Sequence, residues 1–345
     1  MKANHLVPLA HLILGLLALV SHAQAETATD PQLKVAFIGD QGSNLNSEAV
    51  LQLIRDEAEN TGIPVSMVLH QGDFDYNDDP VAWDALINRI LGIDFPYFAS
   101  VGNHDTDRWD GIDGYKAILE QRLARIQDQN CTGVLGVNSA CTYKGLFFIL
   151  SGVGTLGTGH AQYLTNELAA SDAIWELCTW HRNQNSMQVG DKPDDVGWSA
   201  YEECRKAGAI VATGHEHSYS RTRTLTSMEN LTVDPSCSEV GQLCVESGDN
   251  GTTFAFVSGL AGITIRNQDR CLPTTFPYGC NDAWANIYTS DQAATHGALF
   301  ITFNVDDNPN KARGYFKNIN NEIVDDFEIV KISAIVPRAP VLSID

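Results

Sequence analysis

Residues 35–42 read Val-Ala-Phe-Ile-Gly-Asp-Gln-Gly, an apolar run that ends abruptly in a glycine and a carboxylate. Such a run is typical of a short buried strand, and the glycine lets the backbone turn sharply where the strand ends. Four further apolar runs lead into polar side chains in a similar way, at Asp73, Asn103, His181 and His215. Ligands gather outside the carboxyl ends of strands in open α/β sheets, so we expect these strand ends to share one edge.

The rest of the chain supports an α/β fold. Strand-like and helix-like segments alternate at 35–39, 47–60, 65–69, 80–91, 97–101, 115–126, 146–150, 161–170, 174–179, 199–207 and 210–212. This alternation predicts a mostly parallel sheet with helices on its faces. Strand-like runs with few helices between them follow at 254–257, 299–305, 313–316 and 323–329. They predict a second, more antiparallel sheet, and hence a four-layer α/β/β/α sandwich of two packed mixed sheets flanked by helices.

The chain shows no internal division. It has no linker rich in Pro, Gly and Ser and no repeat, so we expect a single domain over residues 33–332. The polar stretch 227–249 is expected to run over the surface, and residues 333–345 to form a C-terminal tail.

The N-terminal residues 1–25 have the features of a signal peptide. Lys2 supplies a positive charge, residues 12–20 form an apolar run, and residues 23–25 read Ala-Gln-Ala, a small-x-small cleavage site. The alternative, a membrane anchor, is disfavoured because the run is short for a bilayer span. We therefore expect a secreted or periplasmic protein with no membrane segment in its mature form.

Charge and cysteine content narrow the functional classes. The net charge is −21 and no basic stripe is present, which disfavours binding to nucleic acid. The eight cysteines are an even number, as expected in an oxidising compartment. Three pairs are close in sequence, at Cys131–Cys141, Cys237–Cys244 and Cys271–Cys280. The remaining Cys178 and Cys204 form either a fourth bridge, which we favour slightly, or two buried thiols.

The polar residues at the strand ends suit metal ions. Each motif alone is more typical of a turn or a loop, so the prediction rests on their combination. Carboxylate, amide and imidazole groups together favour hard and borderline first-row ions over a thiolate site. One carboxylate can bridge two ions, and such a pair polarises a phosphoryl oxygen and lowers the pKa of bound water. It also supplies the positive charge that an acidic surface lacks.

The motifs resemble those of a known family. Gly39-Asp40-Gln41-Gly42, Gly72-Asp73-x-x-Tyr76, Gly102-Asn103-His104-Asp105, His181 and Gly214-His215-x-His217 are similar to the five-motif signature of calcineurin-like metallophosphoesterases. Tyr76, with Tyr219 and Arg221, resembles the purple acid phosphatase branch. The resemblance spans about residues 33–330.

The resemblance implies two metal positions. Asp40, Tyr76 and His217 would bind Fe³⁺, and a hard phenolate ligand suits that ion. Asn103, His181 and His215 would bind Zn²⁺, Mn²⁺ or Fe²⁺, and Asp73 would bridge the two ions. His104 would contact the phosphate and act as a general acid toward the leaving group.

The substrate side departs from that branch. Many plant-type relatives carry further histidines about ten positions beyond the fourth motif, whereas residues 185–190 contain none. His160 from another loop and Arg182 are the candidates for substrate binding, and Arg108 and Asn183 are weaker ones. Asp75 and Asp105 are expected to support the ligands or to form turns.

The sequence therefore predicts an exported binuclear phosphatase that hydrolyses small phosphomonoesters by in-line attack of a metal-bound hydroxide. A phosphodiesterase or nucleotidase with the same two-metal site is the alternative, and a non-catalytic metal-binding module is a third hypothesis. The physiological substrate, the second metal and the oligomeric state stay open.

Overall fold

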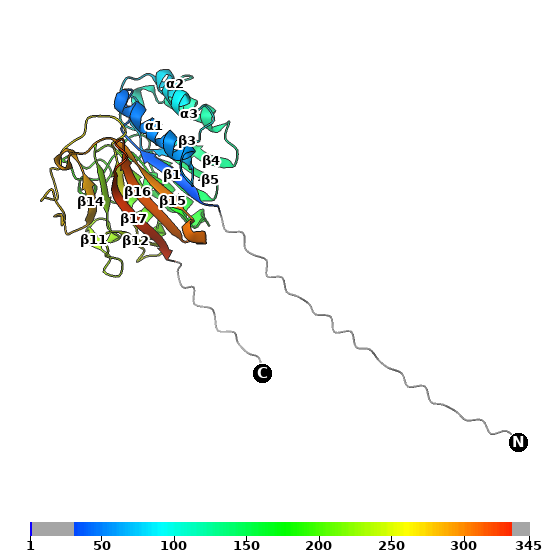
Figure 1. Cartoon of the computed structure of the whole chain (residues 1–345), viewed down its shortest axis with the longest axis vertical. Coiled ribbons are helices and arrows are strands. Elements are labelled where there is room, and N and C mark those ends of the chain that lie inside the picture. Colours follow the sequence, from blue (N-terminus) through cyan, green and yellow to red (C-terminus); the bar gives the residue numbers. More distant parts are fainter. Residues whose placement is uncertain (2–30, 333–345) are drawn as a thin grey trace.

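Two β-sheets packed together form the centre of the molecule in the computed structural model, which describes Met1 and residues 31–332 (Figure 1). The strands and helices in chain order are β1 (Leu33–Ile38), α1 (Leu45–Glu59), β2 (Val65–His70), α2 (Pro80–Ile90), β3 (Tyr97–Ala99), α3 (Tyr115–Leu123), β4 (Gln129–Val134), β5 (Asn138–Tyr143), β6 (Leu146–Ser151), α4 (His160–Ala170), β7 (Glu176–Thr179), α5 (Ser199–Ala207), β8 (Ile210–Thr213), β9 (Tyr219–Thr222), β10 (Leu225–Ser227), β11 (Thr232–Val233), β12 (Gln242–Glu246), β13 (Ala255–Ser258), β14 (Trp284–Tyr288), β15 (Gly297–Phe303), β16 (Lys311–Asn318) and β17 (Ile323–Ile332). Met1 apart, the predicted signal peptide at 1–25 and the predicted tail at 333–345 lie outside the described residues.

The first sheet has seven strands in the order β12-β17-β16-β15-β1-β2-β3. Strand β1 lies inside the sheet, parallel to β2 on one side and antiparallel to β15 on the other. Every residue of β1 is buried, as expected for a strand covered on both faces. Helices α1 and α3 pack against this sheet, and α1, α2 and α3 lie together on one side of the molecule (Figure 1).

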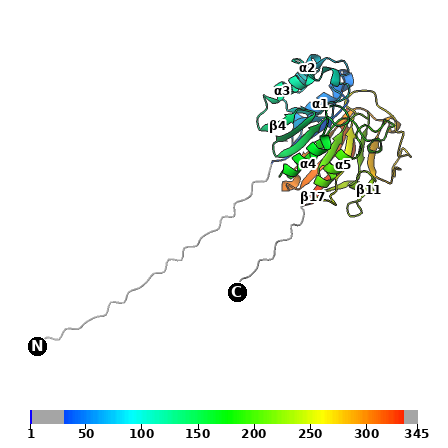
Figure 2. The same cartoon turned by 180° about the vertical axis from the view of Figure 1, so that it is seen from behind.

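The second sheet has eight strands in the order β14-β9-β13-β8-β7-β6-β5-β4. Strands β6, β7, β8 and β13 run parallel, and antiparallel strands flank them on both sides. Helices α4 and α5 pack side by side against β5 to β8 (Figure 2). The four-layer α/β/β/α sandwich predicted from the sequence is therefore confirmed.

The division of strands between the two sheets differs from the prediction. Strands β15 to β17 extend the first sheet beside β1, whereas β13 inserts into the second sheet beside β8. The prediction of a surface excursion at 227–249 is wrong in part, because β12 lies within it and joins the edge of the first sheet. Leu243 and Val245 of β12 are fully buried. Periodicity in a sequence reports which residues are buried, but it does not report which strand a given strand will pair with.

Apolar and ionic contacts hold the two sheets together. The rings of Phe37 on β1 and Phe256 on β13 meet edge to face, with their centroids 5.1 Å apart. The buried Asp325 on β17 accepts hydrogen bonds from Tyr219 and Arg221, which both lie on β9 of the other sheet. These hydrogen bonds therefore join the two sheets across the core.

Four disulfides reinforce the loops and edges of the fold. They join Cys131–Cys141, Cys178–Cys204, Cys237–Cys244 and Cys271–Cys280. The three pairs predicted from their spacing are confirmed, and the open case is a bridge between β7 and α5. No helix among the described residues is long and apolar enough to cross a bilayer.

Candidate metal centre

Five strand ends deliver polar side chains to one edge of the sandwich. Asp40, Asp73 and Asn103 follow β1, β2 and β3 of the first sheet, and the two sites His181 and His215–His217 follow β7 and β8 of the second. These strands are parallel neighbours within each sheet, so their carboxyl ends lie at the same edge. The sequence prediction of a shared edge is realised with both sheets contributing.

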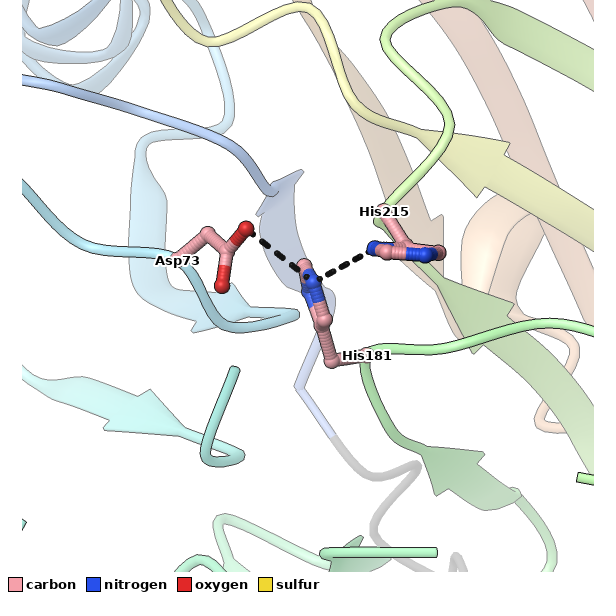
Figure 3. A group of neighbouring side chains, drawn as sticks. All are labelled: Asp73, His181 and His215. Atoms are coloured by element: carbon pink, nitrogen blue, oxygen red, sulfur yellow. Dashed lines mark hydrogen bonds and ion pairs between the residues drawn. The ribbon is translucent and has the colours of Figure 1, made fainter. Parts of the chain in front are cut away.

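One group of donor atoms surrounds His181 (Figure 3). Its Nε2 lies 3.2 Å from Oδ2 of Asp73, 3.1 Å from Nδ1 of His215 and 3.1 Å from Oδ1 of Asn103. Asp73, His181 and His215 each offer one ligand atom, and these atoms all lie within 4.8 Å of one another. Carboxylate, amide and imidazole donors at this spacing could share one metal ion.

A second group surrounds the phenol of Tyr76. Its oxygen lies 3.0 Å from Oδ1 of Asp40 and 3.3 Å from Nε2 of His217. The same Nε2 lies 3.4 Å from Oδ1 of Asp40. The two groups are connected, because Oδ2 of Asp40 accepts a hydrogen bond from the backbone N–H of His215 at 2.8 Å. The structure thus brings all seven predicted ligands together, in the two sets that the resemblance implied.

Four of these seven residues have a left-handed backbone, which residues other than glycine rarely adopt. Their φ angles are 57° at Asp40, 60° at Asp73, 60° at Tyr76 and 69° at His215. Each such residue costs about 1–3 kcal/mol and persists only where its surroundings hold it, a pattern that is common at functional sites. The described chain also adopts this conformation at loop residues away from the centre, such as Lys144 and Leu231, but more than half of the seven donor residues share it.

Asp105 holds two of these strand ends against each other. Its buried carboxylate accepts hydrogen bonds from the backbone N–H groups of Asp73 at 2.9 Å, Phe74 at 2.8 Å and Gly102 at 2.7 Å. Gly102 must be glycine here, since a Cβ at this position would lie 2.1 Å from the backbone nitrogen of Asp73. Burial, together with the charge of Asp73, raises the pKa of Asp105 to about 8. Asp105 thus supports the ligands, as the sequence suggested.

The pKa values of several donor groups are strongly shifted when no cation is bound. Burial lowers the pKa of His181, but the charge of Asp73 outweighs it and raises the pKa to about 9. Burial and the neighbouring His181 lower the pKa of His215 to about 2. Burial and the charges of Asp40 and Asp73 raise the pKa of Tyr76 far above its usual value. A bound cation would favour the anionic forms of the carboxylates and the phenol, so the donor set fits metal ions.

The outer nitrogens of two histidines are fixed by backbone carbonyls. Nδ1 of His181 lies 2.7 Å from the carbonyl oxygen of Gln71, and Nδ1 of His217 lies 2.9 Å from that of Thr264. Both rings therefore present Nε2 to the donor group. Metal-binding histidines are typically oriented in this way by an acceptor behind the ring.

His104 lies at the exposed mouth of this centre. Its ring centroid is 4.5 Å from that of Tyr76, and its backbone N–H donates to Oδ1 of Asp73 at 2.9 Å. The side chain therefore lies beside the donor groups and faces solvent, where a substrate would arrive.

Comparison with known proteins now assigns the family. Residues 33–219, more than half of the chain, match the family model of the calcineurin-like phosphoesterases. The chain belongs to this family. No curated protein matches it significantly.

Three solved structures share the fold of this calcineurin-like phosphoesterase. Purple acid phosphatase PPD1 from seeds of yellow lupin (Lupinus luteus) matches with a TM-score of 0.61 and 17% identity, over 88% of this chain and 54% of its own. GAP50, described as the anchor in the inner membrane complex of Plasmodium, matches with a TM-score of 0.56 and 11% identity, over 88% and 90%. PhoD matches with a TM-score of 0.52 and 13% identity, over 85% and 67%. The chain thus spans about half the length of the lupin enzyme, and at these identities the likeness concerns the fold alone.

The candidates for substrate binding other than His104 either have partners within the protein or lie on the surface. His160 is the first residue of α4, and its Nδ1 lies 2.7 Å from Oδ1 of Asn138 on β5. The described residues show no contact between His160 and the donor groups. Arg182 forms an ion pair with Asp195 at 3.0 Å. The buried Asn183 donates to the carbonyl oxygen of Gly214 at 2.7 Å. Arg108 is exposed in a short 3₁₀ turn.

The loop between β7 and α5 of this phosphoesterase contributes two residues that the sequence reasoning missed. The ammonium of Lys192 donates to the carbonyl oxygen of His215. Burial lowers the pKa of Lys192, and the charges of Asp40 and Glu216 oppose this shift. Oδ2 of Asp195 lies 3.8 Å from Nε2 of His215. The length of this loop was the available signal, since long loops in compact domains often carry function.

Glu216 is a third residue that the sequence reasoning passed over. It lies between the two histidines of the last motif and is fully buried, and neither carboxylate oxygen has a hydrogen-bond partner in the described structure. Burial raises the pKa of Glu216 to about 7. Its carboxylate packs on Gly190, where a Cβ would lie 2.4 Å from its Cδ.

Proposed function

We propose that the protein is an exported hydrolase that cleaves phosphate monoesters with two bound metal ions. The observation that carries this proposal is the convergence of seven donor side chains from five strand ends, four of them held in a strained backbone conformation. Family membership and the fold support a hydrolase that acts on phosphate esters. A purely structural metal site is usually closed and mononuclear, which does not suit seven donors in two groups.

The two groups of donors correspond to two metal positions. Asp40, Tyr76 and His217 would hold Fe³⁺, since a phenolate is a hard ligand. Asn103, His181 and His215 would hold Zn²⁺, Mn²⁺ or Fe²⁺. Asp73 suits the bridging position, because it contacts His181 in one group and its charge raises the pKa of Tyr76 in the other. Once bound, such a pair would polarise the phosphoryl oxygen and lower the pKa of water for an in-line attack.

Proton donation and attraction of the phosphate are assigned to His104 and Lys192, which lie beside the donor groups. His104 would donate a proton to the leaving-group oxygen, a role for which imidazole is suited. Two contacts hold its position: its backbone N–H donates to Asp73, and its ring packs against that of Tyr76. Lys192 supplies a positive charge beside His215, which helps a phosphate to approach a chain whose net charge is −21.

Export to an oxidising compartment is the second part of the proposal. The four disulfides are consistent with a secreted or periplasmic protein, because such bonds persist outside reducing compartments. The described residues contain no unpaired cysteine.

A comparison of two synthetic substrates tests the proposed reaction. The purified, metal-loaded protein is assayed with an aryl phosphate monoester and with the bis-aryl diester over a range of pH. We expect the monoester to be hydrolysed more efficiently, and Asp73→Ala to abolish the reaction together with metal binding. Preferential cleavage of the diester would identify a phosphodiesterase instead. Two bound metals without hydrolysis of either ester would indicate a non-catalytic module.

A further inference from the structure

The outer nitrogen of His215 faces a side chain, whereas those of the other two histidines face backbone carbonyls. His181 and His217 direct Nδ1 at backbone carbonyls and Nε2 at the donor groups. His215 is reversed, with Nδ1 lying 3.1 Å from Nε2 of His181 and Nε2 pointing outward. The group that faces this outer nitrogen is the carboxylate of Asp195, at 3.8 Å. Asp195 therefore occupies the place that a backbone carbonyl takes behind the other two rings.

Asp195 is itself held firmly at the strand ends. Its Oδ1 pairs with Nη1 of Arg182 at 3.0 Å, and its backbone N–H donates to the carbonyl oxygen of Asn183 at 3.2 Å. Asn183 in turn donates to the carbonyl oxygen of Gly214, directly before His215. These bonds link the loop to the ends of both β7 and β8, which carry His181 and His215. The carboxylate is thus fixed relative to the ring that it faces.

We propose that Asp195 is a positioning residue for His215, and that Arg182 acts by holding Asp195. A carboxylate behind a metal-binding imidazole fixes the ring and its tautomer, with the proton on the outer nitrogen, and makes the inner nitrogen a stronger ligand. At 3.8 Å the contact is electrostatic and longer than a direct hydrogen bond. The inference rests on the metal centre proposed above and assigns Arg182 a role other than direct substrate binding.

Metal affinity distinguishes this role from a contact with substrate. Asp195→Asn is compared with Asp191→Asn, which makes the same change of charge at an exposed position of the same loop. The Zn²⁺ affinity of the second metal position is measured by competition with a chromophoric chelator, and folding is followed by circular dichroism. We expect about a 10- to 100-fold loss of Zn²⁺ affinity in Asp195→Asn, the effect typical of removing such a partner, and none in Asp191→Asn.

The companion variant Arg182→Met separates the two roles of the arginine. We expect it to weaken Zn²⁺ binding in the same direction as Asp195→Asn, because the carboxylate loses its anchor. A raised KM for the phosphate ester with unchanged Zn²⁺ affinity would show instead that Arg182 contacts substrate. This variant also keeps the inference testable if Asp195→Asn does not fold.

The result that would overturn the inference differs from the result that would overturn the proposed function. Unchanged Zn²⁺ affinity in both Asp195→Asn and Arg182→Met, with the wild-type protein binding two metals, would refute the positioning role alone. A wild-type protein that binds no metal would refute the proposed centre itself.

Discussion

The phenol oxygen of Tyr76 lies 3.0 Å from Oδ1 of Asp40, and both residues have a left-handed backbone. The hydroxyl donates to the carboxylate, and burial together with the charges of Asp40 and Asp73 raises the pKa of Tyr76. The phenol therefore keeps its proton in the protein alone. Under the proposed assignment, a highly charged ion such as Fe³⁺ would make it a phenolate ligand, and the Fe³⁺–phenolate pair would give the protein a visible absorption.

Replacing Tyr76 tests that connection. In Tyr76→Phe we expect the visible absorption to disappear, because the phenolate is lost, while some activity remains through the other six ligands. The visible spectrum and the iron content of the two proteins are compared at equal concentration. A wild-type protein that is colourless, iron-free and fully active would contradict the assignment of Fe³⁺, although it would leave the fold untouched.

The resemblance associated Tyr219 and Arg221 with the purple acid phosphatase branch, and the structure gives them a structural role. Arg221 is fully buried, and its Nε and Nη2 lie 2.7 and 2.9 Å from the carboxylate of Asp325 on the other sheet. We expect Arg221→Met to lower the free energy of unfolding by about 3–5 kcal/mol, because it leaves Asp325 buried without its charged partner. Adding Asp325→Leu should restore much of the loss, as measured by urea denaturation.

A neighbouring exposed pair provides the control for this cycle. Arg313 and Asp326 lie 2.8 Å apart, with side chains 59% and 46% exposed. Removing either partner should cost at most about 1 kcal/mol, because exposed ion pairs are solvated and screened. Equal losses at the buried and the exposed pair would contradict the assignment of Arg221 to the inter-sheet contact.

The contacts of Glu57 are expected to make the free energy of unfolding depend on pH. Its carboxylate accepts from Tyr315 at 2.6 Å, Lys317 at 2.9 Å and Lys34 at 3.0 Å. Burial acts to raise the pKa of Glu57, but these contacts outweigh it, so the folded-state pKa lies below the usual 4.5. The stabilisation is therefore fully present above the unfolded-state pKa and is lost as the pH falls through the folded-state pKa.

The variant Glu57→Gln measures this contribution. We expect it to lower the free energy of unfolding at pH 7, and the difference from wild type to shrink progressively below the unfolded-state pKa. Urea denaturation of both proteins at pH 7, 5, 4 and 3 provides the comparison. A difference that stays constant over this range would show that the charge of Glu57 is not the cause.

Lys192 is expected to contribute to substrate binding. Replacing it with methionine removes the ammonium beside His215 but keeps the length of the side chain. We expect KM for an aryl phosphate to rise about tenfold, equivalent to about 1.4 kcal/mol, with a smaller change in kcat. Lys206→Met, which removes an exposed lysine paired with Glu203 on α5, is the matched control. Identical KM values for the two variants would remove Lys192 from the substrate site.

Most of the ligands could be found in the sequence because they directly follow apolar runs, whereas Tyr76 was assigned only through the family resemblance. That pattern fixes both the strand and the edge at which its polar residue lies, as the positions of Asp40, Asp73 and His215 show. The pairing of β15 with β1 and of β13 with β8 could not be found in this way, because tertiary packing selects the partner of a strand. The β4–β5 hairpin was missed as well. Strand β4 reads Gln-Asn-Cys-Thr-Gly-Val, and Val134 is its only aliphatic residue, so the sequence shows no apolar alternation there.

The substrate side of the site was the least predictable part. Lys192 and Asp195 lie in a polar loop without periodicity, and only the folded loop brings them to His215. His160 was a reasonable candidate by residue type, but its ring, at the start of α4, contacts the side chain of Asn138 on β5. The left-handed backbone at Tyr76 could not be inferred either, because tyrosine is not among the residue types that are enriched in this conformation.

Counting the metal ions bound per chain is the most direct test of the proposed centre. The purified protein and its Asp73→Ala variant are analysed for iron, zinc and manganese after exhaustive dialysis, with hydrolysis of an aryl phosphate measured on the same samples. We predict two metal ions per chain and hydrolysis in the wild-type protein, and the loss of both in Asp73→Ala. A wild-type protein that hydrolyses the ester with fewer than two ions, or an Asp73→Ala variant that keeps both ions and full activity, would contradict the two-metal centre.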